Sequence, residues 1–136
     1  MAWAVLADDF TGALDTGLQF ARQGLATIFH FGDRPVAAGA LVLSSDSRAL
    51  APAEAAAAAA AAARAAGPGR RYYKKIDSTL RGNIAPELAA IMNATSIQKA
   101  ILAPAYPGQH RTTVGGIQHI DGLPVTATEL ARDPQS

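Results

Sequence analysis

Acidic and hydroxyl side chains gather at three points of the sequence, each directly after a short apolar run. They are Asp8-Asp9, Ser44-Ser45-Asp46 and Asp77-Ser78-Thr79. Adjacent carboxylates and hydroxyls can bind the hydroxyls of a polyol, and paired carboxylates can also hold a hard cation. Any one of these segments could equally cap a following helix. Their recurrence at three places favours a shared binding site.

The segment from Arg64 to Arg81 contains six basic residues and only one acid. Such a local excess of positive charge is typical of an anion site. On an extended strand Lys75 and Asp77 share one face and Lys74 the other, and a lysine on an inner strand must reach the sheet edge or be paired. Arg81 precedes a predicted helix, where it opposes the helix dipole unless it binds an acid. The alternative is an exposed edge strand with solvated lysines.

A separate polar stretch runs from Pro104 to Gly116 and has the prolines and glycines of a loop. Arg111 and Thr112, with the glycine pair 115–116, could bring backbone amides close to a ligand. His110 could act as an acid or base, although a histidine without a visible partner is more often a surface residue.

Alternating strands and helices are predicted to position these segments. Apolar runs predict strands at 2–7, 26–31, 40–43 and 100–103, and a further strand is predicted at 71–77. Three helices are predicted. The first follows the first strand and carries Leu14, Leu18 and Ala21 on one face, the second spans 51–66, and the third begins after Asn83, its expected N-cap. Val114–Ile120, Asp121-Gly122 and Leu123–Val125 predict a β-hairpin.

This order predicts an α/β fold: an open, mainly parallel sheet flanked by helices, with a C-terminal β-hairpin. In such sheets, ligands bind at the carboxyl ends of the strands. The segments that begin at Asp8, Ser44 and Asp77 are therefore expected along one edge of the sheet.

Composition limits the function classes. The 136 residues suit one domain, and 12 basic against 11 acidic residues give a formal charge of +1, unlike a general nucleic-acid binder. Cysteine is absent, which excludes thiol chemistry. We see no signal peptide or membrane anchor and expect a cytoplasmic protein. Neither a P-loop nor a dinucleotide fingerprint occurs, which argues against an NAD-type domain.

Three ordered motifs resemble the four-carbon acid sugar kinases. The first motif is 7–13, followed by Asp15-Thr16-Gly17. The second is 75–83, and the third is 102–107 continuing into 111–116. The tail, with Asp121-Gly122-Leu123-Pro124-Val125 and Asp133-Pro134, is also similar to the family. The resemblance covers the whole chain.

The resemblance implies an ATP-dependent kinase that phosphorylates a terminal hydroxyl of threonate, erythronate or a 3-oxo-tetronate. Residues 1–136 would be its N-terminal acid-sugar-binding domain. Asp8 and Asp9 would receive sugar hydroxyls, and one of them would take the hydroxyl proton. Lys75, Ser78 and Arg81 would hold the carboxylate. Further substrate contacts are expected from the same motifs, at Thr11, Asp77, Arg111 and Thr112.

The family's C-terminal ATP-binding domain does not fit within these residues, so ATP and Mg²⁺ are expected to bind elsewhere in a longer protein and no metal or cofactor is expected to bind this chain stably. The expected partners are a small carboxylate sugar and that missing domain, with no nucleic acid or membrane. The alternative function is a non-catalytic module that binds small acids or dimerises. That alternative predicts a homodimer, formed by dimerisation or strand exchange through 114–125.

Overall fold

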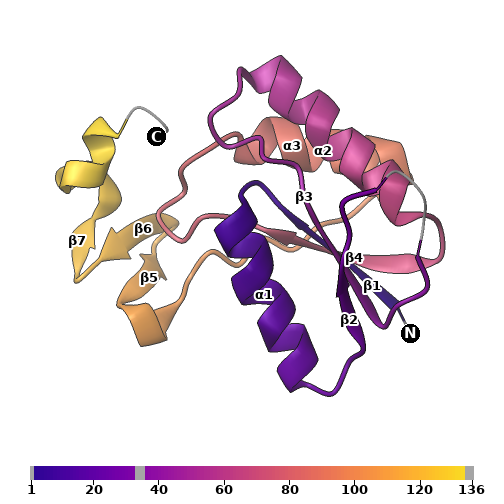
Figure 1. Ribbon diagram of the computed structural model, residues 1–136. Helices are drawn as coiled ribbons and strands as arrows, with labels where there is room; N and C mark the ends of the chain where they lie inside the picture. The colour runs from indigo at the N-terminus through magenta and orange to yellow at the C-terminus, as the bar shows by residue number, and fades with distance from the viewer. Residues whose placement is uncertain (1, 33–35, 134–136) are drawn as a thin grey trace.

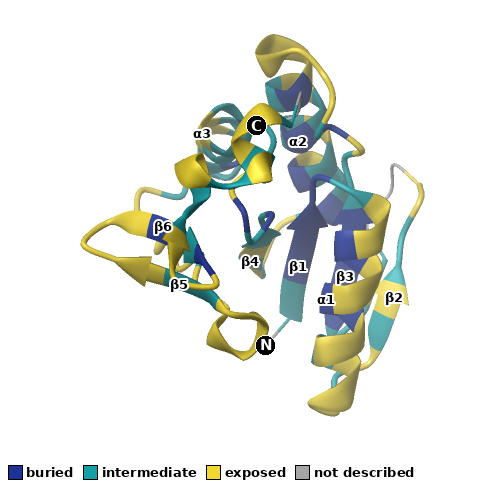
Figure 2. Ribbon diagram, turned by 90° about the vertical axis from the view of Figure 1, so that its left-hand side faces the viewer, coloured by how far each residue is buried: buried dark blue, intermediate teal, exposed yellow. Residues whose placement is uncertain are grey.

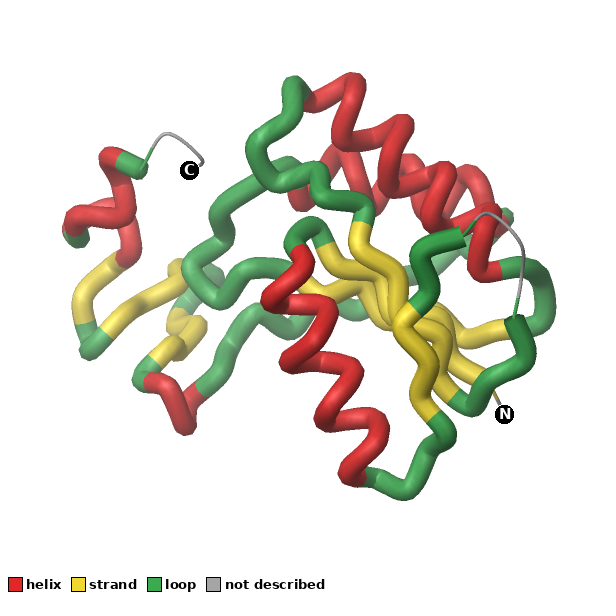
Figure 3. The backbone as a smooth tube through the Cα atoms, in the orientation of Figure 1, coloured by secondary structure: helices red, strands yellow, loops and turns green. Residues whose placement is uncertain are grey.

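The computed structural model describes residues 2–32 and 36–133. It contains a helix-flanked sheet and a separate antiparallel ribbon, joined by a long loop (Figures 1 and 3). In chain order the elements are β1 (Ala2–Ala7), α1 (Phe10–Arg22), β2 (Thr27–Phe29), β3 (Ala40–Ser44), α2 (Pro52–Ala66), β4 (Arg70–Lys75), α3 (Ile84–Thr95), β5 (Arg111–Val114), β6 (Ile117–Ile120) and β7 (Leu123–Pro124), with short 3₁₀ turns η1 (Pro107–Gln109), η2 (Val125–Ala127) and η3 (Glu129–Arg132).

The main sheet is entirely parallel, with strand order β2-β3-β1-β4. The predicted parallel α/β sheet is confirmed. The central strand β1 is buried on both faces because helices cover both sides (Figure 2). Ala4 and Leu6 point to the layer of α2 and α3, whereas Val5 and Ala7 point to α1.

Alanine dominates the contact of α2 with the sheet. Ala59, Ala63 and Ala66 pack in one cluster with Leu6 and Leu41. The small side chains allow the helix to approach the sheet closely, as the predicted smooth helix face requires. No helix in the described residues is both long and apolar enough to cross a membrane.

The predicted buried face of α1 is wrong. Leu14 and Leu18 are exposed, and the helix instead buries small residues: Gly12, Ala13, Thr16 and Gly17. A Cβ at Gly17 would collide with the ring of Phe29 and lie 3.1 Å from Val42 Cγ2. The helix thus packs too closely for leucine to fit underneath. The helix begins at Phe10, directly after its N-cap Asp9.

The predicted strand at 100–103 is also wrong. This segment is an exposed loop, and Ile101 is 97% exposed. Its apolar residues fit the pattern of a buried strand, but the segment adds no strand beside β4, which is the edge of the sheet in the described residues. The loop passes from α3 to the ribbon (Figure 3).

The ribbon is an antiparallel sheet of order β5-β6-β7. The predicted hairpin at Asp121-Gly122 is confirmed, with φ of 49° and 81° at its two turn residues. A second turn at 115–116 splits the single strand predicted for 114–120 into β5 and β6. Both of its glycines have positive φ, which explains why glycine stands there.

Candidate functional site

The carboxyl ends of three adjacent strands form one polar edge of the main sheet, which we call the strand-end site. β1 lies between β3 and β4, so the segments after these strands meet. Ser45 donates from its backbone N–H and its hydroxyl to the carbonyl of Ala7, and the N–H groups of Ser47 and Arg48 donate to the carbonyl of Asp8. The three polar segments thus converge as the fold predicts.

Arg48, which sequence reasoning missed, is the centre of this site. Its Nε lies 2.7 Å from Asp8 Oδ2 and its Nη2 lies 3.1 Å from Asp8 Oδ1, while Nη1 lies 2.9 Å from Asp9 Oδ2. Burial alone would lower the pKa of Arg48, but the hydrogen bond to Asp8 and the charges of Asp8 and Asp9 raise it above its ordinary value. Arg48 is therefore held as a cation between two carboxylates.

The two aspartates play different structural parts. The side chain of Asp8 is 4% exposed and that of Asp9 is 26% exposed. Asp9 is the N-cap of α1, where its Oδ1 accepts from the N–H of Gly12 at 2.9 Å. A Cβ on Gly12 would collide with that carboxylate oxygen. Asp9 is thus fixed in place and still reachable from solvent, whereas Asp8 is enclosed.

Asp77 and Arg81 form a second charged pair at the strand-end site. Arg81 donates from Nε to Asp77 Oδ2 at 3.0 Å and from Nη2 to Oδ1 at 3.1 Å. Thr79 donates its hydroxyl and its N–H to Asp77. Burial alone would raise the pKa of Asp77, but these hydrogen bonds and the Arg81 charge hold it well below its ordinary value.

Asp133 also binds Arg81, with 3.1 Å between Nη1 and Oδ2. The hydrogen bond to Asp77 chiefly raises the pKa of Arg81, and the contact with Asp133 adds to it. The sequence predicted that Arg81 must bind an acid, and in the structure that acid comes from the chain itself. Arg81 does not stand open as a carboxylate clip.

Lys74 and Lys75 point to opposite sides of the sheet, as strand alternation predicts. Because β4 is an edge strand, Lys74 does not lie on an inner strand, yet it is not solvated either: its side chain is 9% exposed and pairs with the buried Glu87 at 2.6 Å. Lys75 lies on the α1 side, where its Cγ stands 3.5 Å from the position of a Cβ on Gly12. Its ammonium donates to the carbonyl of Ile76 at 2.7 Å. Lys75 therefore lies beside the N-terminus of α1 and Asp9.

Residues of the ribbon connect to this site indirectly. Gln118 is buried and donates to the carbonyl of Ser78 at 2.7 Å. Arg111 in β5 donates to the carbonyl of Gln109, and no described hydrogen bond joins it or Thr112 to the site carboxylates. His110 is exposed in a turn. The glycine pair 115–116 forms the hairpin turn between β5 and β6.

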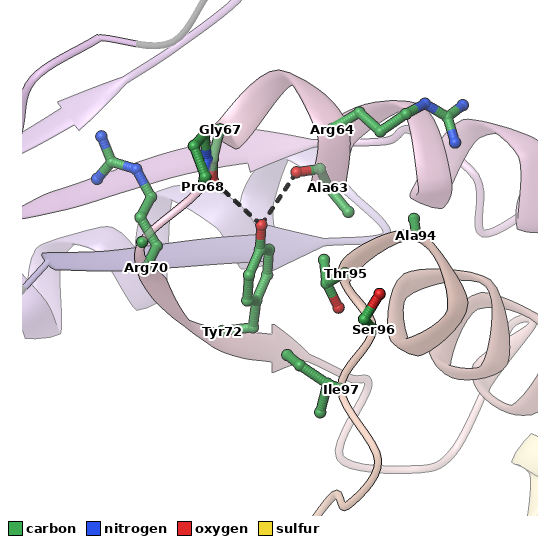
Figure 4. Close-up of a pocket in the computed structure, with 11 residues that line it drawn as sticks. Ala63, Arg64, Gly67, Pro68, Arg70, Tyr72, Ala94, Thr95, Ser96 and Ile97 are labelled. Carbon is green, nitrogen blue, oxygen red and sulfur yellow. Dashed lines mark hydrogen bonds between the residues drawn. The ribbon is translucent and has the colours of Figure 1, made fainter.

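The six basic residues of 64–81 do not form one anion site. Arg64 and Arg70 line a hollow of about 410 Å³ at the start of β4, at the opposite end of the strand from Asp77 (Figure 4). Arg70 donates to the carbonyls of Ala66, Trp3, Ala38 and Val36. Arg71 lies 5.9 Å from the Trp3 ring. Only Lys74, Lys75 and Arg81 belong to the strand-end site.

Thr11 is exposed in the first turn of α1, beside Asp9. No cluster of three or more His, Asp or Glu side chains in residues 2–32 and 36–133 has the arrangement of a metal site. The aspartates are instead paired with two arginines: Asp8 and Asp9 with Arg48, and Asp77 and Asp133 with Arg81. This arrangement can accept hydroxyls at Asp9 and supply positive charge at Lys75.

Comparison with known proteins identifies related chains. The D-threonate kinase of Salmonella typhimurium is 42% identical over 142 residues, covering 100% of this chain and 34% of the relative. The D-erythronate kinase of Heliobacterium modesticaldum is 39% identical over 142 residues, covering 97% of this chain and 32% of the relative. The chain thus spans about a third of the length of these relatives.

Solved structures share the fold. A domain of unknown function from Bordetella bronchiseptica, determined with bound citrate as a domain-swapped dimer, has a TM-score of 0.89 and 38% identity, covering 99% of this chain and 36% of that one. A Haemophilus influenzae protein has a TM-score of 0.84 and 26% identity, covering 98% of this chain and 35% of that one.

A family model described as a sugar-binding N-terminal domain matches residues 3–136, nearly the entire chain. This match and the kinase relatives agree with the three ordered motifs of the sequence. The chain therefore belongs to the sugar-binding N-terminal domains of the four-carbon acid sugar kinase family.

Proposed function

We propose that residues 1–136 bind the acid sugar of a cytoplasmic, ATP-dependent kinase that phosphorylates a terminal hydroxyl of a four-carbon acid such as threonate, erythronate or 3-oxo-tetronate. The observation that carries this proposal is the state of Asp9. Its carboxylate is fixed by Arg48 and by the helix cap, yet it remains partly exposed beside Lys75. The kinase relatives supply the substrate class.

Asp9 is the best placed acceptor for the reacting hydroxyl. A kinase acts mainly by positioning its substrates, and an aspartate can accept the proton of the hydroxyl as it attacks phosphorus. Asp8 is too enclosed for this role and serves to hold Arg48. ATP with Mg²⁺ supplies the phosphoryl group when bound. The described residues of this chain offer no cluster suited to the metal, so we assign it no ligands here.

Lys75, Ser78 and the first turn of α1 at Thr11 are proposed to receive the substrate carboxylate. A helix N-terminus and a nearby ammonium both favour negative charge. Arg81 can contribute only if the substrate displaces Asp133 or binds beside it, since its three donor nitrogens already face carboxylates. Arg111 and Thr112, on β5 of the ribbon, are proposed as further substrate contacts.

Calorimetry tests the binding proposal directly. D-threonate and D-erythronate should bind the chain, and erythritol, which lacks the carboxylate, should not. Asp9→Asn should weaken acid binding about tenfold or more because a charged hydrogen-bond acceptor is lost. Asp15→Asn is the matched control, since Asp15 is exposed on the same helix. Failure of every four-carbon acid to bind the folded protein would contradict the proposal.

The phosphorylation step is tested on the complete gene product that carries this chain. With ATP and Mg²⁺ it should convert D-threonate or D-erythronate to a phosphate ester, and Asp9→Asn should lower kcat more than it changes KM. The Asp15→Asn variant should retain full turnover. An unchanged kcat in folded Asp9→Asn would exclude Asp9 as the proton acceptor.

We also propose that the chain self-associates through the ribbon. Val114, Ile117 and Leu123 are each more than half exposed. Apolar residues on an uncovered antiparallel ribbon favour pairing with a second copy, and the Bordetella relative was solved as a domain-swapped dimer. Light scattering should show a dimer that Val114→Asp and Ile117→Asp together disrupt. A strict monomer at high concentration would contradict this proposal.

A further inference from the structure

Glu87 is a buried acid that none of the site motifs explains. It lies in the first turn of α3 and is 1% exposed, in a helix whose next buried residue, Ile91, belongs to the hydrophobic core. An apolar residue would ordinarily occupy such a position. A carboxylate there is tolerated only when charged or polar groups compensate for its lost hydration.

Two side chains supply that compensation, and both come from strand ends of the site. Ser47 Oγ donates to Glu87 Oε1 at 2.7 Å, and Lys74 Nζ lies 2.6 Å from Glu87 Oε2. Lys74 also lies 4.0 Å from Asp8 Oδ1 and donates to the carbonyl of Lys75. Glu87 thus joins α3 to the segment after β3 and to the last residues of β4.

Each partner of Glu87 bears on the placement of Arg48. Ser47 precedes Arg48, and the backbone N–H groups of both residues donate to the carbonyl of Asp8, at 2.8 and 3.2 Å. Asp8 in turn uses both carboxylate oxygens to bind Arg48. The Arg48 side chain then reaches Asp9 at 2.9 Å. A continuous set of contacts therefore leads from Glu87 to the partly exposed carboxylate of Asp9.

We propose that Glu87 is a positioning residue for the acid-sugar site, acting through Lys74 and Ser47 to keep Arg48 between Asp8 and Asp9. The proposed role in substrate binding rests on the proposed function. Glu87 neutralises Lys74, so Asp8 remains free to bind Arg48 with both oxygens. Without the Glu87 charge, the nearest carboxylate to the Lys74 ammonium is Asp8, and lysine and arginine compete for it.

The decisive variant is Glu87→Gln, which keeps an oxygen for Ser47 and removes only the charge. The Nε–H of Arg48, observed by two-dimensional NMR, reports directly on its hydrogen bond to Asp8. In Glu87→Gln this resonance should shift and exchange faster with solvent, and binding of D-threonate should weaken about tenfold. Glu54→Gln is the matched control because Glu54 is exposed in the first turn of α2. Glu54→Gln should leave the Arg48 resonance and the affinity for D-threonate unchanged.

A second variant separates positioning from simple neutralisation of Lys74. Lys74→Met together with Glu87→Met removes both charges and should recover stability, since paired buried charges can be exchanged for apolar groups. It should recover the Arg48 resonance and D-threonate binding only in part, because Lys74 no longer competes for Asp8 while Ser47 still loses its acceptor. Recovery of both to wild-type values, or an unaltered Arg48 resonance in folded Glu87→Gln, would overturn the proposal. If no acid binds the wild type, the proposed function fails, while the Arg48 resonance still decides the role of Glu87.

Discussion

Gly82 lies so close to Asp8 that a Cβ at this position would stand 3.1 Å from Asp8 Oδ2 and 3.3 Å from the Cγ of Arg48. The residue also has a φ of +90°, which side chains rarely adopt. Glycine is therefore needed for two reasons, backbone conformation and space. The loop after β4 can then lie directly against the Asp8–Arg48 pair.

Gly82→Ala should destabilise the protein and loosen the strand-end site. Gly24→Ala is the matched control, because Gly24 has a similar φ of +82° and open space around it. The backbone strain should cost each variant about 1 kcal/mol. The added crowding should cost Gly82→Ala about 1–2 kcal/mol more. Urea unfolding measures the difference, and equal losses in the two variants would show that Asp8 and Arg48 do not confine this position.

Arg48→Met should be among the most damaging single changes in the chain. It leaves the carboxylate of Asp8 buried without its arginine, which should lower the free energy of unfolding by about 3 kcal/mol. Arg22→Met, at the exposed last turn of α1, should change it by less than about 0.5 kcal/mol. Thermal unfolding followed by circular dichroism compares the two variants. Similar melting temperatures would exclude Arg48 as a structural centre of the site.

The central strands β1 and β3 were predictable from sequence because each is a short continuous apolar run, such as Ala40–Ser44, which is typical of a buried parallel strand. The same rule failed at Ile101, where an equally apolar run is exposed. On α1, leucine spacing suggested a buried face, but the close approach of Gly17 to Phe29 selects the face with small residues. Packing distance overrode side-chain hydrophobicity in that helix.

The strand-end location of the site was predictable, whereas its internal pairing was not. Asp8, Asp9 and Asp77 follow strands and so had to share one edge of the sheet. Arg48 and Glu87 stand in no recognisable motif, and their pairing depends on where α3 and the loop after β3 settle. A hint existed for Glu87, since it falls one turn before Ile91 on the apolar face of α3. An acid on an apolar helix face signals a buried partner.

Asp77 should make the stability of the protein fall at acid pH. Its folded-state pKa is lowered, so its ionised form stabilises the folded protein at neutral pH. The unfolded chain binds this proton near pH 4, the ordinary value for aspartate. The contribution is therefore full above about pH 4 and is lost as the pH falls toward the lower folded-state pKa.

Asp77→Asn should remove this part of the pH dependence. The variant should be less stable than the wild type at pH 7, and the gap should narrow between pH 4 and pH 2. Asp15→Asn should follow the wild-type profile, because Asp15 is exposed. Unfolding in urea at several pH values gives both curves. A constant gap at every pH would contradict the role of Asp77.

Gln118 should control how firmly the ribbon is joined to the strand-end site. Its amide donates to the carbonyl of Ser78 at 2.7 Å, and its Oε1 accepts from the hydroxyl of Thr113 at 2.6 Å. Gln118→Ala removes both bonds and leaves the half-buried carbonyl of Ser78 without its donor, at a cost of about 1 kcal/mol. Amide hydrogen exchange should accelerate in β5 and β6 more than in β1. Gln98→Ala, at an exposed position, should change neither. If exchange in the ribbon stays slow in Gln118→Ala, other contacts hold it to the site.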